Sequence, residues 1–276
     1  MRFAKAHGLG NDFILVEEGL APEEPGPWAR RLCDRHIGVG ADGVLLYRPV
    51  PEGVGMRLIN ADGGEVELSG NGVRCLGAWA SRQGIAPARH TVFTRSGPRP
   101  VEVESLSKAR YRVVTGLGPP ILRSDLIPMS LTPPRKTVLD EPLSLGSETV
   151  RVTAISLGNP HCAVFLDTVA DDALVARLGP ALERHPAFPV RTNVEFVTVT
   201  NRQEIRVRFW ERGVGPTLAS GTGSGSAFVA AVLRGLVDRT ARVVCDGGVL
   251  EVEWPEGGEL RQVGEVEILF EGDWLP

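Results

Sequence analysis

Lysine and cysteine are both scarce in this chain of 276 residues. The lysines are Lys5, Lys108 and Lys136, and none lies in a glycine-rich context that would suit the Schiff base of a pyridoxal phosphate enzyme. The 4 cysteines are scattered, with no C-x-x-C pair, which argues against a metal site or a disulfide framework. We therefore expect neither a metal nor an organic cofactor.

Long apolar runs and blocks of basic charge are also missing. No stretch approaches the length of a membrane-spanning helix, and the first residues have no apolar signal core. The net charge is −4, and no cluster of basic residues stands out. This composition argues against a nucleic-acid or membrane partner, and it favours a cytoplasmic protein with a small-molecule ligand.

The most distinctive feature that is present is a glycine-rich stretch around Ser220, with a second copy around Ser69. Residues 208–223 align with residues 57–72 at a constant offset, since 220 − 69 and 208 − 57 both give 151. Each stretch is followed by an apolar run, as is typical of a turn that leads into a helix. A repeat of this length is too long for a solenoid and predicts a duplicated α+β domain.

The predicted helix ends around Ser69 and Ser220 are suited to binding an anion. The first backbone N–H groups of a helix have no partner within the helix, and the helix dipole adds about half a positive charge there. A carboxylate is therefore stabilised at such an end. Each serine alone is an ordinary N-cap residue, but two at matching positions of a duplication indicate a shared site.

The remainder of the chain alternates strands with a few helices, which predicts an α+β fold of two similar domains. Gly116–Pro120 breaks the pattern, so we place the boundary near 117–120. We expect a first domain of 1–118, completed by the last strand within 263–276, and a second domain of 119–262. Helices are expected at 28–36, 70–83, 171–183 and after Gly223, and strands at 13–16, 44–47, 56–59, 91–94, 101–104, 111–114, 163–166, 194–200, 205–210, 242–244, 249–254 and 266–270.

Several polar residues near these turns have both a structural and a functional interpretation. His161 follows Asn159 and a proline ahead of an apolar strand, where histidine is more often structural than catalytic. Glu211 and Arg212 follow two apolar residues and enter the glycine-rich turn, and a zwitterionic ligand would supply partners for both charges. Gly38–Gly43 has the spacing G-x-G-x-x-G, but a helix precedes it and a strand follows, which is the reverse of a dinucleotide site.

A series of ordered motifs makes the chain resemble the diaminopimelate epimerase family, whose members are cofactor-independent amino-acid racemases. The resemblance covers essentially the whole chain. The motifs are Gly8-Leu-Gly-Asn11-Asp-Phe13, Gly38-Val-Gly-Ala-Asp-Gly43, Asn60-Ala-Asp-Gly63, Ser69-Gly-Asn-Gly-Val-Arg-Cys75, Gly158-Asn-Pro-His161, Arg191-Thr-Asn193-Val-Glu195, and Glu211-Arg-Gly-Val-Gly215 with Gly221-Thr-Gly223.

This resemblance implies a fold and a set of site residues. The fold would be two similar α+β halves, each a curled sheet around a central helix, with the site in the cleft between them. Ser69 and Ser220 would occupy the two proton-transfer positions, and His161 and Glu211 would tune them. The substrate would be bound by Asn11, Asn60, Gly70, Asn71, Asn159, Asn193, Glu211, Arg212, Gly221 and Thr222.

One departure from the family concerns the chemistry directly. The family carries cysteine at both positions that are Ser69 and Ser220 here. A hydroxyl is far less acidic than a thiol, so we expect the interconversion of LL- and meso-diaminopimelate, a step of lysine and cell-wall precursor synthesis, to be slow. Cys75 and Cys162 lie near the motifs but cannot simply substitute.

Two other functions remain open at this stage. The chain could be a related isomerase or dehydratase of the same fold that acts on another amino acid, or a non-catalytic amino-acid-binding protein. Turnover with several amino acids would separate an enzyme from a binding protein. A homodimer is also left open.

Overall fold

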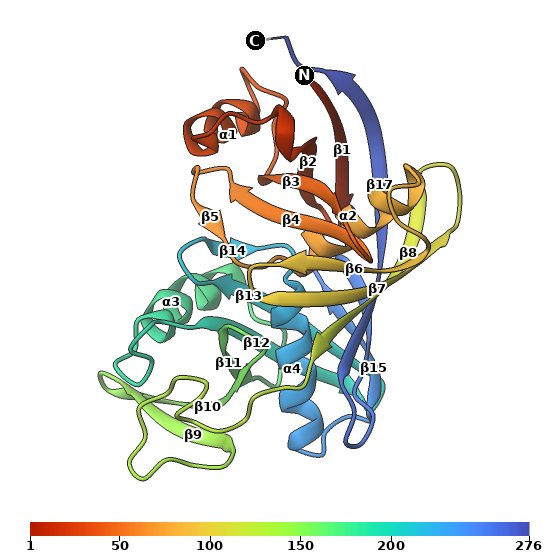
Figure 1. The fold of residues 1–276 in the computed structure, drawn as a ribbon. Coiled ribbons are helices and arrows are strands. Elements are labelled where there is room, and N and C mark those ends of the chain that lie inside the picture. Colours follow the sequence, from red (N-terminus) through yellow and green to blue (C-terminus); the bar gives the residue numbers. More distant parts are fainter. Residues whose placement is uncertain (276) are drawn as a thin grey trace. The chain divides into compact units, whose positions relative to one another are not determined.

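The computed structural model describes residues 1–275, so Pro276, the last residue of the predicted 263–276 segment, lies outside the described residues. The chain forms two compact units. Unit 1 consists of Met1–Gly116 and the described residues from Val263 onward, and unit 2 is Leu117–Gln262. Figure 1 labels their elements.

Unit 1 contains a long mixed sheet and two α-helices. Its helices are α1 (Pro25–Cys33) and α2 (Gly70–Arg82), with a short 3-10 turn at Glu18–Leu20. Its strands are β1 (Arg2–Gly8), β2 (Asn11–Glu17), β3 (Gly43–Val50), β4 (Gly53–Asn60), β5 (Glu65–Val66), β6 (Arg89–Thr94), β7 (Gly97–Ser105), most of β8 (Arg110–Gly118) and most of β17 (Leu260–Asp273).

Unit 2 is built from the same kinds of element. Its helices are α3 (Asp172–Glu183) and α4 (Gly221–Leu233). Its strands are β9 (Val138–Leu145), β10 (Glu148–Ser156), β11 (Pro160–Phe165), β12 (Asn193–Asn201), β13 (Glu204–Glu211), β14 (Gly215–Thr217), β15 (Thr240–Cys245) and β16 (Gly248–Glu253).

The strand pairings repeat from one unit to the other. In unit 1, β1–β2 is antiparallel, β2–β3 parallel, β3–β4 antiparallel, β4–β6 parallel and β6–β7 antiparallel. In unit 2, the same succession runs β10–β11, β11–β12, β12–β13, β13–β15 and β15–β16. In unit 1, β17 pairs with both β1 and β8, and β7 pairs with β8, so the sheet closes on itself. The predicted fold class, two similar α+β halves, is confirmed.

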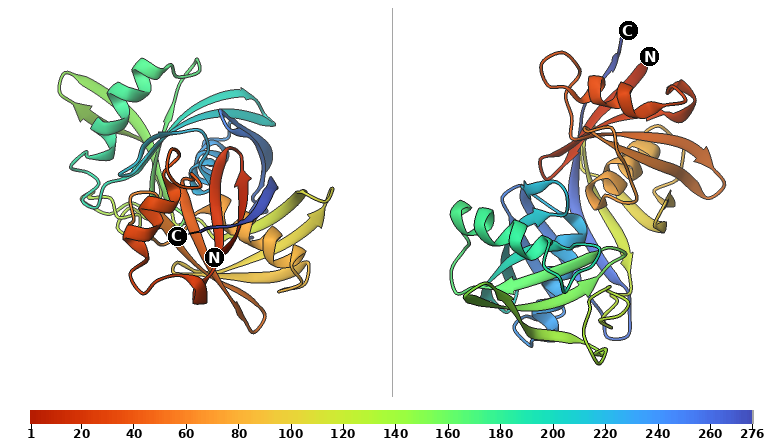
Figure 2. Two further views of the ribbon diagram at one scale, coloured as in Figure 1. Left: turned by 90° about the horizontal axis from the view of Figure 1, so that it is seen from above. Right: turned by 90° about the vertical axis from the view of Figure 1, so that its left-hand side faces the viewer.

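A helix lies at the centre of each curled sheet. The helix α2 contacts β1, β2, β3, β4, β6 and β7, and α4 contacts β10, β11, β12, β13, β15 and β16. The view from above in Figure 2 looks nearly along α4, with strands of unit 2 around it. Small residues permit this close packing, because a Cβ on Gly225 would lie 2.9 Å from the Leu117 Cδ1 atom. A helix that is apolar on all sides, as α4 is, is expected to be buried.

The two central helices begin at or close to the predicted positions, α4 slightly before the expected Gly223. The helix expected at 70–83 is α2, and α4 begins directly after Ser220. The helix expected at 28–36 begins earlier, at Pro25, because proline is pre-organised for the first turn and its missing N–H has no partner there in any case. The prediction missed β1, β9 and β10 and the two short strands β5 and β14.

Candidate functional site

Ser69 and Ser220 cap the two central helices in nearly identical ways. The Ser69 Oγ atom accepts a hydrogen bond from the Gly72 N–H over 3.1 Å, and the Ser220 Oγ atom accepts one from the Gly223 N–H over 3.2 Å. Their backbone angles also match, with φ −134° and ψ 123° at Ser69 and φ −136° and ψ 126° at Ser220. Because each hydroxyl oxygen acts as an acceptor in its cap, its own proton stays available to another acceptor.

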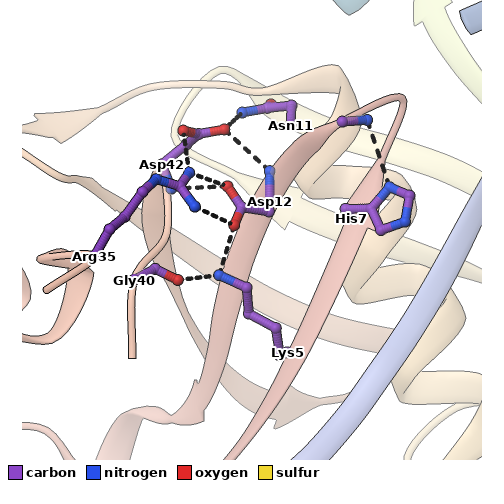
Figure 3. Close-up of polar contacts among 8 residues, drawn as sticks. Lys5, His7, Asn11, Asp12, Arg35, Gly40 and Asp42 are labelled. Carbon is purple, nitrogen blue, oxygen red and sulfur yellow. Dashed lines mark hydrogen bonds and ion pairs between the residues drawn. The ribbon is translucent and has the colours of Figure 1, made fainter. Parts of the chain in front are cut away.

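The turn that carries Asn11 is backed by a group of charged side chains (Figure 3). Asp12 forms ion pairs with Lys5 over 2.6 Å and with Arg35 over 2.7 Å, and Arg35 also reaches Asp42 over 3.0 Å. Burial raises the pKa of Asp12, but the hydrogen bonds and charges of Arg35 and Lys5 outweigh it and hold that pKa well below its usual value. The group therefore keeps the Asp12 carboxylate charged beside Asn11.

From this group a chain of hydrogen bonds leads to the N-terminus of α2. The Asn11 Nδ2 atom donates to Asp42 Oδ2 over 2.8 Å, and the Asn11 Oδ1 atom accepts from Asn71 Nδ2 over 3.2 Å. The Asn71 Oδ1 atom in turn accepts from the guanidinium of the fully buried Arg74. A carboxylate only accepts and a guanidinium only donates, so the two ends fix the orientation of both amides.

Unit 2 has a related chain that includes an imidazole. The Asn159 Nδ2 atom donates to the Thr222 Oγ1 atom, at the N-terminus of α4, over 3.5 Å. The Asn159 Oδ1 atom lies 2.9 Å from His161 Nε2, and His161 Nδ1 lies 2.7 Å from Glu195 Oε1. The His161 and Glu195 side chains are each only 1% exposed, and burial raises the pKa of Glu195 despite the opposing effect of His161.

A second set of contacts in unit 2 shapes the turn that precedes α4. The Asn193 Nδ2 atom donates to the Pro160 carbonyl over 2.9 Å, and its Oδ1 atom accepts from the Arg212 backbone N–H over 2.9 Å. The Glu211 Oε1 atom accepts from the Thr217 hydroxyl over 2.7 Å. Asn193 therefore connects the start of β11 to the turn that holds Glu211 and Arg212.

The predicted site residues thus gather in two groups, one in each unit. In unit 1, Asn11 and Asn71 are hydrogen-bonded directly, and Gly70 and Asn71 follow Ser69 at the start of α2. Asn60 is the last residue of β4 and closes a turn in which its N–H donates to the Gly64 carbonyl over 2.8 Å. The unit 2 group comprises Asn159, His161, Asn193, Glu211, Arg212, Ser220, Gly221 and Thr222.

Two residues with a clear place in these groups were not predicted as site residues. Asp42 orients Asn11 and Glu195 orients His161, and both belong to motifs that the sequence displays. Glu195 had a local signal, because it is an acidic residue within the buried run of β12. Asp42 had no such signal, since it lies in a loop and its partner Asn11 lies on β2.

The cysteines are not placed for proton transfer. Cys75 and Cys162 are fully buried within the hydrophobic cores of the two units. Burial raises the pKa of Cys75 to about 12 and that of Cys162 well above its usual value. Within residues 1–275, no group of three or more histidine, cysteine, aspartate or glutamate side chains could hold a metal ion.

A hollow of about 510 Å³ on unit 1 lies apart from these groups. It is lined by residues that include Arg48, Arg57 and Arg95, and by none of the predicted site residues. The three arginines form ion pairs with Glu18 or Glu65 at 3.0 to 3.5 Å, so their charge is largely offset. Across residues 1–275, no helix has the length and apolar character needed to span a membrane.

Comparisons of the sequence with known proteins agree on one family. A family model described as "Diaminopimelate epimerase" matches residues 3–122 and 153–269. The chain is 45% identical over 280 residues to a protein of that name from Pelotomaculum thermopropionicum, with 99% of each chain covered. It is 46% identical over 281 residues to one from Desulforudis audaxviator, covering 100% of this chain and 99% of the relative. A solved structure of a predicted epimerase from Pseudomonas aeruginosa has the same fold, with a TM-score of 0.71, 16% identity and 100% and 99% coverage.

Proposed function

The chain belongs to the diaminopimelate epimerase family, and from that premise we propose that it inverts the α-carbon of a diamino-dicarboxylic acid, interconverting LL- and meso-diaminopimelate. The reaction is a two-base proton transfer without a cofactor. It takes place in the cytoplasm as a step of lysine and cell-wall precursor synthesis. The substrate is a small molecule, no nucleic acid takes part, and a homodimer is left open.

The observation that carries this proposal is the matched pair of serine-capped helices. Inverting a carbon centre without a cofactor requires one group to remove the proton and another to return it to the opposite face. The two caps have the same geometry, on equivalent helices of a duplicated fold. We assign Ser69 and Ser220 to the two proton-transfer positions, one for each face of the α-carbon.

The same helix ends account for substrate binding in the proposal. The free N–H groups at Gly70 and Asn71, and at Gly221 and Thr222, are suited to the α-carboxylate and to the charge that develops as the proton leaves. The Asn71 side-chain amide is held by Asn11 and Arg74, which fixes its orientation at the start of α2. The remaining contacts to the substrate come from Asn11, Asn60, Asn159, Asn193, Glu211 and Arg212.

The weak point of this site is the acidity of its two hydroxyls. A hydroxyl with a pKa close to the 15.7 of water is about 7 units less acidic than a thiol near 8.5, which corresponds to about 10 kcal/mol. A helix N-terminus supplies only about 1 kcal/mol for a nearby negative charge. His161 and Glu211 assist by accepting or supplying a proton, but we expect turnover to stay slow.

Binding and isotope exchange together test this function. Calorimetry with LL- and meso-diaminopimelate is expected to show binding, and incubation in deuterium oxide is expected to label the α-position slowly. Tighter binding of another amino acid, such as lysine or proline, would refute the substrate. Binding with no exchange, even after thiols replace both hydroxyls, would instead indicate an amino-acid-binding protein.

We also propose that the domain division follows the duplication, with 1–118 and 263–276 as one domain and 119–262 as the other. The strand pairings that repeat between the two units support this assignment. Limited proteolysis tests it, since the first cuts are expected in the proline-rich stretch after residue 118.

A further inference from the structure

We propose that Glu195 is the positioning residue of His161, and that the two side chains carry one proton as a single acid–base unit. This inference rests on the proposed function, because it assigns a task to the histidine of that site. It does not extend to the substrate, which Glu195 is not proposed to touch.

The register of two parallel strands brings the pair together. His161 on β11 lies opposite Asn193 on β12, and Ala163 lies opposite Glu195. Side chains alternate along a strand, so His161, Asn193 and Glu195 share one face. The other face carries residues such as Cys162 and Val194, which pack in a core cluster with the α3 residues Val175, Leu178 and Leu182. The His161 face is therefore turned toward α4, which contacts both strands.

A purely structural role does not require a carboxyl group at position 195. Glu195 is 1% exposed, and the His161 ring and the Cys162 backbone N–H do not outweigh the effect of burial, which raises the pKa of its carboxyl group. Burying a carboxyl group that is not fully compensated is costly. A glutamine could hold the same histidine without a titratable group, since its amide oxygen accepts as a carboxylate does. What glutamine cannot do is exchange a proton with the imidazole.

The orientation of Asn159 determines where the protons lie. Its Oδ1 atom faces His161 Nε2 over 2.9 Å, and a carbonyl oxygen only accepts, so Nε2 carries a hydrogen. The 2.7 Å contact between Nδ1 and Glu195 Oε1 then holds one further proton, on either atom. In both arrangements the pair has no net charge, which suits its buried position.

The pair can release a proton without forming an imidazolate. The Nε2–H bond breaks and its proton goes to a deprotonated proton-transfer residue of the site. The proton shared with Glu195 then stays on Nδ1. The ring ends neutral, and the negative charge resides on the Glu195 carboxylate. Return of the proton to Nε2 reverses each step.

The chain of hydrogen bonds around Asn11 in unit 1 differs from the one around His161. There the carboxylate of Asp42 accepts directly from the amide of Asn11, with no imidazole between them. An amide does not ionise near neutral pH, so the unit 1 chain through Asn11 only orients its groups. The two halves therefore differ: the His161–Glu195 pair of unit 2 is buried at 2.7 Å, whereas the His7–Glu267 pair of unit 1 is partly exposed at 3.7 Å.

Nitrogen-15 NMR of the histidine rings tests the inference without substrate. The chain has 5 histidines, and the His161→Gln variant assigns the signals of His161. In the parent protein, Nδ1 of His161 is expected to show a shift between those of a protonated and an unprotonated nitrogen, because its proton is shared with Glu195. In Glu195→Gln one ring nitrogen should show the full shift of an unprotonated nitrogen, because the shared proton is gone. An unchanged His161 spectrum would overturn the proposal.

A matched control separates this effect from loss of packing. Glu183 is also a buried glutamate of unit 2, and its carboxylate accepts from the Trp210 Nε1 atom over 2.8 Å and from the Gly213 N–H over 3.0 Å. Glu183→Gln is expected to lower stability and to leave the His161 signals in place. If Glu195→Gln does not fold, Glu195→Asp serves instead, since its carboxyl group is one methylene further from Nδ1; a parent-like His161 spectrum in that variant would again overturn the proposal.

Kinetics provide a second readout, in a variant with cysteine at both positions 69 and 220. Adding Glu195→Gln is expected to lower kcat by about 100-fold with little change in KM, and Glu195→Asp to restore part of it. An unchanged kcat would overturn the kinetic role of Glu195. Failure of the proposed function is distinguishable. In that case the double-cysteine variant would not epimerise the substrate, while the NMR signals of His161 would still change in Glu195→Gln.

Discussion

Asn71 donates a hydrogen bond to Asn11 over 3.2 Å, and the duplicated half repeats the contact between Asn159 and Thr222 over 3.5 Å. In both units, an asparagine at or directly before the start of a strand is hydrogen-bonded to the second residue of the central helix, which donates in unit 1 and accepts in unit 2. The helix end and the turn are therefore held in a fixed relation by a single amide. Substitutions that alter these hydrogen bonds are therefore expected to change the orientation of each asparagine side chain.

Replacing Asp42 by asparagine is expected to weaken ligand binding. Asparagine can turn either its oxygen or its NH₂ group toward Asn11, so the fixed direction of the chain to Asn71 is lost. The Asp42 side chain is 44% exposed, so the expected loss in the free energy of unfolding is only about 1 kcal/mol. Calorimetry and urea unfolding measure the two effects. Glu102→Gln, which breaks an exposed ion pair elsewhere in unit 1, is the control and should bind ligand normally.

Acidification is expected to destabilise the fold through Asp12. The pKa of Asp12 is held below its usual 3.8, so on acidification the unfolded chain takes up a proton before the folded one does. The stabilisation by Asp12 is therefore complete above about pH 5, and it is lost as the pH falls through 3.8 and below. Urea midpoints measured from about pH 6 to about pH 3 should fall steadily, and Asp12→Asn should flatten part of that slope. An equally steep slope in Asp12→Asn would show that other carboxylates, such as Glu65 and Glu183, carry the effect.

The serine caps should contribute to stability apart from any chemistry. Ser69→Ala and Ser220→Ala each remove the acceptor for one N–H of the first helical turn, at a cost of about 1 kcal/mol. Glycine at the same positions is expected to cost only a few tenths of a kcal/mol, because it is tolerated as an N-cap. Equal stability of the alanine and parent proteins in urea would contradict the capping geometry.

The central helices and their caps could be predicted because their signals are local. Ser69 and Ser220 each precede a run of small and apolar residues, and the constant offset between them revealed the duplication. The strands β9 and β10 were not predicted, although Val150, Val152 and Ala154 alternate in β10, because the prolines up to Pro142 obscure the strand pattern. In the structure, β9 and β10 pair as an antiparallel hairpin over residues 138–154.

The supporting residues of the site could not be predicted in the same way. Glu195 meets His161 because β11 and β12 are parallel and in one particular register, which sequence periodicity does not fix. Asp42 meets Asn11 through the equivalent parallel pairing of β2 with β3. Both contacts depend on strand pairing across about 30 residues of chain. The acidic residue within the buried run of β12 is visible in the sequence, but its partner is not.

Restoring thiols is the sharpest test of the proposed chemistry. Cysteine at both positions 69 and 220 is expected to raise the rate of epimerisation by orders of magnitude, because a thiolate costs far less to form than an alkoxide near neutral pH. Sulfur is a weaker acceptor than oxygen, so the same variant should lose part of each cap and unfold at slightly lower urea concentration. Activity should thus rise while stability falls, which a general effect on folding would not produce.

The single variants distinguish two-base chemistry from other schemes. With one thiol, at Ser69→Cys or Ser220→Cys, full inversion should stay slow, since each face of the α-carbon needs its own group. Exchange of the α-proton with deuterium should then proceed without inversion, from one stereoisomer only, and the favoured stereoisomer should switch with the position restored. A double variant that binds the ligand yet remains as slow as the parent would remove Ser69 and Ser220 from the proton-transfer positions, and a parent as fast as the double variant would do the same.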